Sequence, residues 1–136
     1  AANSGATCVF DTPGASNFTL PAPELGMRFT FITVVQNTAD HVIQAATGGD
    51  GFIGGVISAA TDSSSADSFA AEADGSNDFI TLNATDSGGT PGTRIEVVAL
   101  ADTSGAGCWG VSGQIGCTIE EGGTGTTISP FGDTQL

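Results

Sequence analysis

The sequence has no lysine and no tyrosine, and its only strongly basic residues are two arginines, Arg28 and Arg94. Its 15 aspartates and glutamates give it a formal net charge of −13 at pH 7. Binding to a nucleic acid or to an anionic membrane surface requires clustered lysines and arginines that neutralise phosphates. The composition therefore predicts no nucleic acid and no membrane surface as partners. The lack of lysine also excludes a phosphate-binding P-loop.

Long apolar runs are also missing. The longest, residues 29–35, contains two threonines and is far shorter than the roughly 20 residues needed to cross a bilayer. No signal peptide is recognisable, and Ala1 fits either removal of an initiator methionine or cleavage of an export signal.

Residues that carry catalysis or hold metals are few. His41 is the only histidine, no motif ties it to a nucleophile, and we expect it on the surface or in a turn. One histidine and three scattered cysteines, Cys8, Cys108 and Cys117, lack the paired spacing of a zinc site. The acidic segment 74–78 lacks the distal glutamate of a calcium loop and is expected to be a solvated turn. We predict no catalytic residue, no metal site and no cofactor, and therefore a structural or binding protein rather than an enzyme.

The sequence does contain a series of short β-strand signals. Apolar residues at helical spacing are nearly absent, and only residues 66–73 would tolerate a short helix or turn. Turn residues separate the candidate strands, which are 7–10, 17–20, 28–35, 42–45, 52–57, 78–83, 94–101, 108–112 and 114–119. This pattern predicts an all-β fold, an antiparallel β-sandwich that is jelly-roll-like or a partly open barrel.

Two of these strands, 28–35 and 94–101, are predicted to be central because both of their faces are largely apolar. The core and structural residues that we predict are Phe29, Phe31, Ile95, Val97 and Trp109.

The 136 residues suit one domain. We expect a sandwich domain over residues 7–119, an N-terminal arm over 1–6 and a Gly/Thr-rich C-terminal arm over 120–136. The C-terminal arm contains two isolated apolar residues, Ile128 and Phe131, which are predicted to contact a partner.

A disulfide is one expectation for the cysteines. A two-residue hairpin turn at Ser112-Gly113 would place Cys108 opposite Cys117, with Cα atoms about 4.5 Å apart. That separation is within the range of a disulfide bond. Two states remain open: a bridge that leaves Cys8 over, or three reduced thiols, which a cytoplasmic site of assembly favours.

Residues 17–32, NFTLPAPELGMRFTFI, resemble the Thr-Leu-Pro-x-Pro-x-x-Gly-x-x-Phe-x-Phe-Ile signature of small phage capsid decoration (head cement) proteins. The likeness extends from about residue 5 to about residue 115 and includes the Trp-x-Val-Ser-Gly ending at 109–113. It implies a structural virion protein, made in the host cytoplasm, that sits as a homotrimer on the outer capsid surface. There it would bind the major capsid protein and stabilise the shell by contacts between capsomers, and no catalytic residue carries over.

The alternative is a receptor- or glycan-binding β-module of a phage tail or a secreted protein. Exposed aromatic side chains for stacking on sugars would favour it, and the single tryptophan and absent tyrosine count against it.

Overall fold

The structure is a computed structural model that describes residues 3–46, 50–60, 68–72, 76–83, 87–101, 107–117 and 130–132. The described residues form strands and no helix, so they include no helix able to cross a membrane. The all-β class is therefore confirmed, and the helix-tolerant stretch contains a short strand instead. The strands are β1 (Thr7–Phe10), β2 (Ser16–Thr19), β3 (Arg28–Thr33), β4 (His41–Gln44), β5 (Gly51–Ala60), β6 (Ser68–Ala70), β7 (Phe79–Leu82), β8 (Arg94–Ala101), β9 (Gly107–Cys117) and β10 (Phe131–Gly132).

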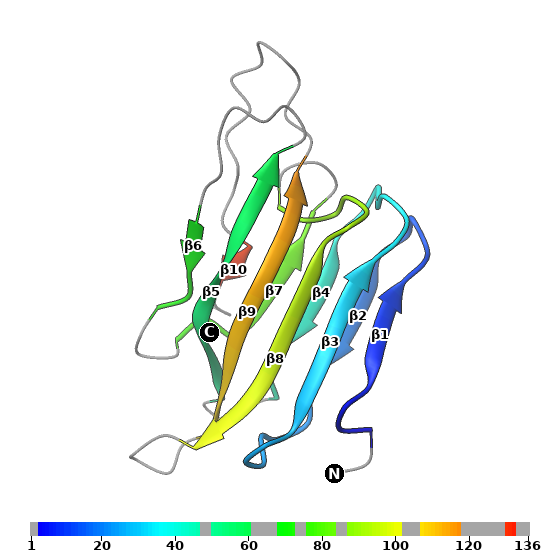
Figure 1. The fold of residues 1–136 in the computed structure, drawn as a ribbon. Coiled ribbons are helices and arrows are strands. Elements are labelled where there is room, and N and C mark those ends of the chain that lie inside the picture. Colours follow the sequence, from blue (N-terminus) through cyan, green and yellow to red (C-terminus); the bar gives the residue numbers. More distant parts are fainter. Residues whose placement is uncertain are drawn as a thin grey trace.

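These strands form two sheets that face each other as a sandwich (Figure 1). A six-stranded sheet has the order β1-β3-β8-β9-β5-β6, and a four-stranded sheet has the order β10-β7-β4-β2. Each sheet ends in edge strands, so the described strands make an open sandwich and not a closed barrel.

The sheets are mixed rather than purely antiparallel. The pairs β1/β3, β2/β4 and β5/β9 are parallel, and the other pairs are antiparallel. The chain alternates between the two sheets from β1 to β5, so that β1 and β3 reach neighbouring places in one sheet with the same direction. The same alternation makes β2 and β4 parallel in the other sheet.

The inward-facing side chains of the two sheets form one hydrophobic core. The five predicted core residues are all at most 2 % exposed, which confirms them: Phe29, Phe31, Ile95, Val97 and Trp109. The two strands predicted to be central are hydrogen-bonded neighbours, with Phe29 opposite Val97 and Phe31 opposite Ile95. Each such side chain contributes about 1.5–3 kcal/mol through burial.

The predicted hairpin at Ser112-Gly113 is wrong, because β9 runs through both residues as one strand. Gly113 has a φ of +151°, and a Cβ atom there would collide with the backbone carbonyl oxygen of Arg94. The glycine therefore allows β8 to approach β9 closely and does not form a turn.

Of the two states left open for the cysteines, the structure contradicts the Cys108–Cys117 bridge. The two cysteines lie near opposite ends of β9, and an extended strand separates them by about 30 Å. That is far beyond disulfide distance, and none of the three cysteines forms a disulfide in the structure.

The segment predicted as an N-terminal arm is attached to the sandwich where it is described. The Gly5 N–H donates to the Arg28 carbonyl oxygen at 2.7 Å, and the Thr30 N–H donates to the Ala6 carbonyl oxygen at 3.0 Å. Residues 5 and 6 thus extend the pairing of β1 with β3.

Phe131, which is predicted to contact a partner, lies in β10, and its contact with a partner stays a prediction. Phe131 pairs with Ile80 of β7 and packs, half-buried, against the core. An isolated aromatic residue in a polar segment here completes the edge of a sheet. Ile128, the other predicted contact residue, lies outside the described residues.

Candidate functional site on the six-stranded sheet

The outer face of the six-stranded sheet carries both arginines of the chain. Burial alternates along β3 and β8, so that Phe29 and Ile95 point into the core while Arg28 and Arg94 are exposed on the other side. Of the seven carboxylates among the described residues, only Glu96 lies in a strand, and it lies on this same face. The other six lie between strands: Asp11, Glu24, Asp40, Asp50, Glu72 and Asp78.

The strand register fixes the spacing of these charges. Arg28 is opposite Val98 and Arg94 is opposite Ile32, so the arginines are four residues apart along neighbouring strands. This corresponds to about 14 Å between their Cα atoms. Glu96 lies between them along this diagonal. Within the part of the chain that the structure describes, neither guanidinium forms an ion pair or a hydrogen bond.

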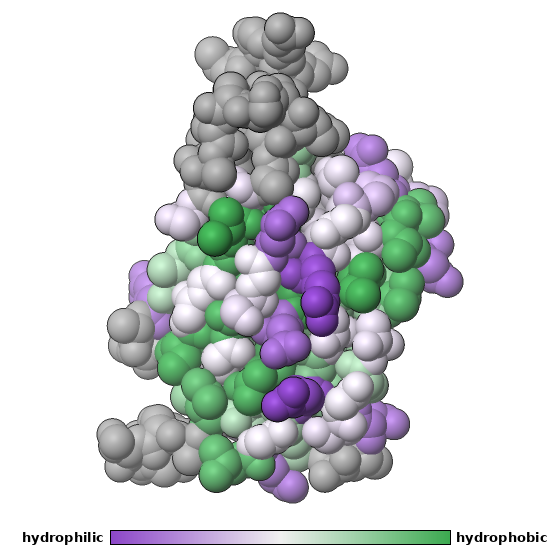
Figure 2. Space-filling view, viewed as in Figure 1, coloured by the Kyte–Doolittle hydropathy of each residue, from purple (hydrophilic) through white to green (hydrophobic). Residues whose placement is uncertain are grey.

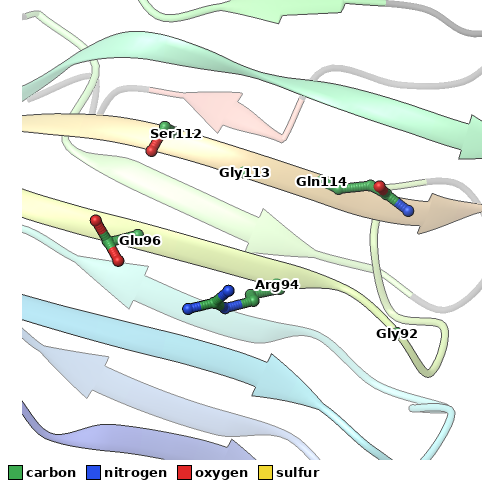
Figure 3. Close-up of a pocket in the computed structure, with 6 residues that line it drawn as sticks. All are labelled: Gly92, Arg94, Glu96, Ser112, Gly113 and Gln114. Atoms are coloured by element: carbon green, nitrogen blue, oxygen red, sulfur yellow. The ribbon is translucent and has the colours of Figure 1, made fainter.

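A shallow hollow of about 470 Å³ lies beside Arg94 over β8 and β9. Figure 3 shows its lining residues, which are Gly92, Arg94, Glu96, Ser112, Gly113 and Gln114. The Gly113 backbone is exposed in this hollow, between the side chains of Ser112 and Gln114. The hollow offers a guanidinium, a carboxylate, a hydroxyl and an amide to a polar side chain that enters from outside.

Aliphatic side chains frame this charged centre. Val9 is 51 % exposed, Ile57 57 % and Leu100 38 %, and Ile32 is half-buried. Figure 2 shows this side of the molecule, on which hydrophobic residues lie on both sides of a row of hydrophilic ones. We call this surface the arginine face; it consists of Arg28, Arg94, Glu96, Ser112, Gln114 and these four aliphatic residues. Arginine set among apolar residues is typical of protein–protein interfaces.

Comparison of the chain with protein-family models, with curated proteins and with solved structures gives no significant match. Sequence reasoning assigned no role to Arg28, Arg94 or Glu96. The sequence does contain a pattern that could have indicated them, because each of the three occupies a polar position in a strand whose alternate residues are apolar. What the pattern did not contain was the pairing of β3 with β8, which brings the three charges together.

His41 is buried at the start of β4, so the expectation of a surface or turn histidine is wrong. Its ring stacks on Phe10 with centroids 4.5 Å apart, and among the described residues neither ring nitrogen has a partner at good hydrogen-bond geometry. Burial lowers its pKa, and the backbone of Thr12 and the charge of Asp40 only partly oppose this effect. The side chain therefore acts as a packing residue that favours the neutral form.

The three cysteines are likewise placed for packing. Cys8 is half-buried on β1, and burial raises the pKa of its thiol. Cys108 is 9 % exposed and its thiol donates to the Leu100 carbonyl oxygen at 3.8 Å. Cys117 is 1 % exposed within the core. A raised pKa and burial disfavour the thiolate that nucleophilic chemistry requires.

The acidic turn is only partly described. The Ser76 hydroxyl donates to a Glu72 carboxylate oxygen at 2.6 Å, and the Asn77 side-chain oxygen accepts from the Glu72 N–H at 2.8 Å. These oxygen atoms thus link Glu72 with Ser76 and Asn77. Among the described residues, no three His, Cys, Asp or Glu side chains lie close enough to share a metal ion.

Proposed function

We propose that this protein is a structural virion protein of the decoration, or cement, type. In this proposal it binds the outer surface of a phage capsid through the major capsid protein, as a homotrimer, and stabilises the shell by contacts between capsomers. Its work is adhesion and not catalysis.

The observation that carries the proposal is the place of the signature residues in the sandwich. Leu20, Phe29 and Phe31 of the decoration-type signature are at most 2 % exposed, on the stretch that leads from β2 in one sheet to β3 in the other. Gly26 in the connecting turn has a φ of +87°, a conformation that glycine adopts readily. The resemblance thus lies in residues that determine the fold, which supports a shared architecture rather than a coincidental match of sequence.

The electrostatics of the chain support the same role. A decoration protein lies outside the shell and away from packaged DNA, so it needs no basic patch for phosphates. Many copies on one lattice act together, so that each contact can be weak while occupancy stays high.

The alternative of a glycan-binding module is disfavoured by the aromatic residues. All eight phenylalanines and the tryptophan are buried or half-buried, and none is exposed. Stacking on a sugar ring needs an accessible aromatic face.

Electron microscopy of virions from the phage that encodes this chain tests the proposal. We expect density for the sandwich on the outside of the shell, and its loss when the gene is deleted. Heads without the protein should also break at lower temperature than complete heads. Density only on the tail would support the alternative, and absence of the protein from virions would overturn the proposal.

A further inference from the structure

We propose that the arginine face is the surface that meets the capsid shell, and that Arg28 and Arg94 bind carboxylates of the shell protein. This inference rests on the proposed function and names the contact through which it would act.

Positive charge is concentrated on one face of the molecule. The chain as a whole is strongly acidic, yet its only two arginines lie on one face of one sheet with a single carboxylate between them. The remaining described carboxylates lie in the connections at the ends of the strands. The arginine face is therefore a cationic centre inside an anionic molecule, and such a centre selects a partner surface that presents carboxylates.

The two guanidiniums have no partners within the described part of the chain. An exposed arginine without an ion pair costs little in water, but covering it by a protein surface requires a charged or polar partner. Two carboxylates about 14 Å apart would satisfy both arginines at once. Aliphatic side chains around them, including Val9, Ile57 and Leu100, supply apolar contact area.

The hollow between β8 and β9 gives the face its local shape. An acidic or amide side chain of the shell protein that enters this depression would meet the Arg94 guanidinium and the side chains of Ser112 and Gln114, with the Glu96 carboxylate also in the lining. A long polyanion such as a nucleic acid is excluded, because its phosphates would be repelled by the carboxylates in the connections at both ends of the strands.

The experiment compares two variants that change the net charge equally. Arg28→Gln/Arg94→Gln removes two positive charges from the arginine face. Asn17→Asp/Thr19→Glu adds two negative charges to exposed positions of β2, in the other sheet. Binding of each full-length protein is measured by co-sedimentation with heads of the encoding phage from which the native protein has been deleted. The melting temperature and the fluorescence of Trp109, the only tryptophan, verify that each variant is folded.

We expect the arginine variant to bind heads at least about tenfold more weakly than wild type, and the β2 variant to bind within about twofold. Raising NaCl from about 0.05 to about 0.5 M should weaken wild type more than the arginine variant. If wild type binds heads and the two variants bind them with equal affinity, the arginine face is not the surface that meets the shell. The proposed function would be unaffected by that result.

Two other outcomes also overturn the inference. Failure of wild type to bind heads contradicts the proposed function and this contact with it. A change in oligomeric state of the arginine variant in sedimentation, with head binding intact, would assign the face to contacts between copies instead.

Discussion

Gly113 shows how a single missing side chain sets the distance between two strands. A Cβ atom at this position would meet the carbonyl oxygen of Arg94 and would come within 2.9 Å of the Ile95 Cα atom. We expect Gly113→Ala to destabilise the protein by about 2–4 kcal/mol, because overpacking and an unfavourable φ act together. The melting temperature should fall by about 10 °C.

Gly116 provides the control for this substitution in the same strand. A Cβ atom there would lie 3.5 Å from its nearest neighbours, which is ordinary contact. Gly116→Ala should be neutral or slightly stabilising, since alanine restricts the unfolded chain. Equal melting temperatures for the two variants would show that β8 and β9 are not in close contact at Gly113.

His41 couples the stability of the sandwich to pH. Its pKa is lowered in the folded state, so as the pH falls the unfolded chain takes up a proton first, near pH 6.5. Stability should therefore decrease as the pH falls below about 6.5, down to the folded-state pKa. Urea unfolding followed through Trp109 fluorescence, at steps from about pH 7.5 to about pH 5, measures this loss.

His41→Phe is the matched variant, because a phenyl ring can stack on Phe10 in the same way without titrating. Its stability should be nearly constant between about pH 7 and about pH 5.5, above the range of ordinary carboxylates. If the stability of His41→Phe kept the pH dependence of wild type, a group other than His41 would be responsible for it.

At the scale of the elements, the sequence predicted what is local and missed what is distant. Alternation over 94–101 predicted β8 with its observed bounds, and 7–10 predicted β1 equally well. The parallel pairing of β1 with β3 could not be predicted, because no local pattern reports that β2 lies in the other sheet. Ser112-Gly113 has a turn-like composition, and only the contact with β8 shows why a glycine stands inside a strand.

The continuous β9 leads to a prediction about the thiols. Alkylation in denaturant without reductant should modify three cysteines, since none is bridged. In the native protein Cys8, which is half-buried, should react faster than Cys108 and Cys117, which are nearly covered. Mass spectrometry of peptides at successive times gives the three rates. A disulfide-linked peptide containing Cys108 and Cys117 would contradict the strand.

At the scale of the whole molecule, charge of one sign dominates. With only two arginines and one histidine, most of the 15 carboxylates have no cationic side chain to pair with. The candidate site followed from this imbalance only after the fold placed both arginines on one face, because the sequence separates them by more than sixty positions. The same imbalance causes repulsion between carboxylates in the folded state, and salt should weaken that repulsion.

We therefore expect the free energy of unfolding to rise by on the order of 1 kcal/mol between about 0.01 and about 0.3 M NaCl, as the screening length shortens. Sodium chloride is preferable to sulfate, which strengthens apolar burial by exclusion from the surface. Urea midpoints followed through Trp109 fluorescence measure the change, and a flat or falling stability would contradict it. Arg28→Gln/Arg94→Gln should gain more from salt than wild type, because its net charge is more negative. Salt should thus stabilise the fold while it weakens contacts of the arginine face, and these opposite signs separate the two effects within one titration.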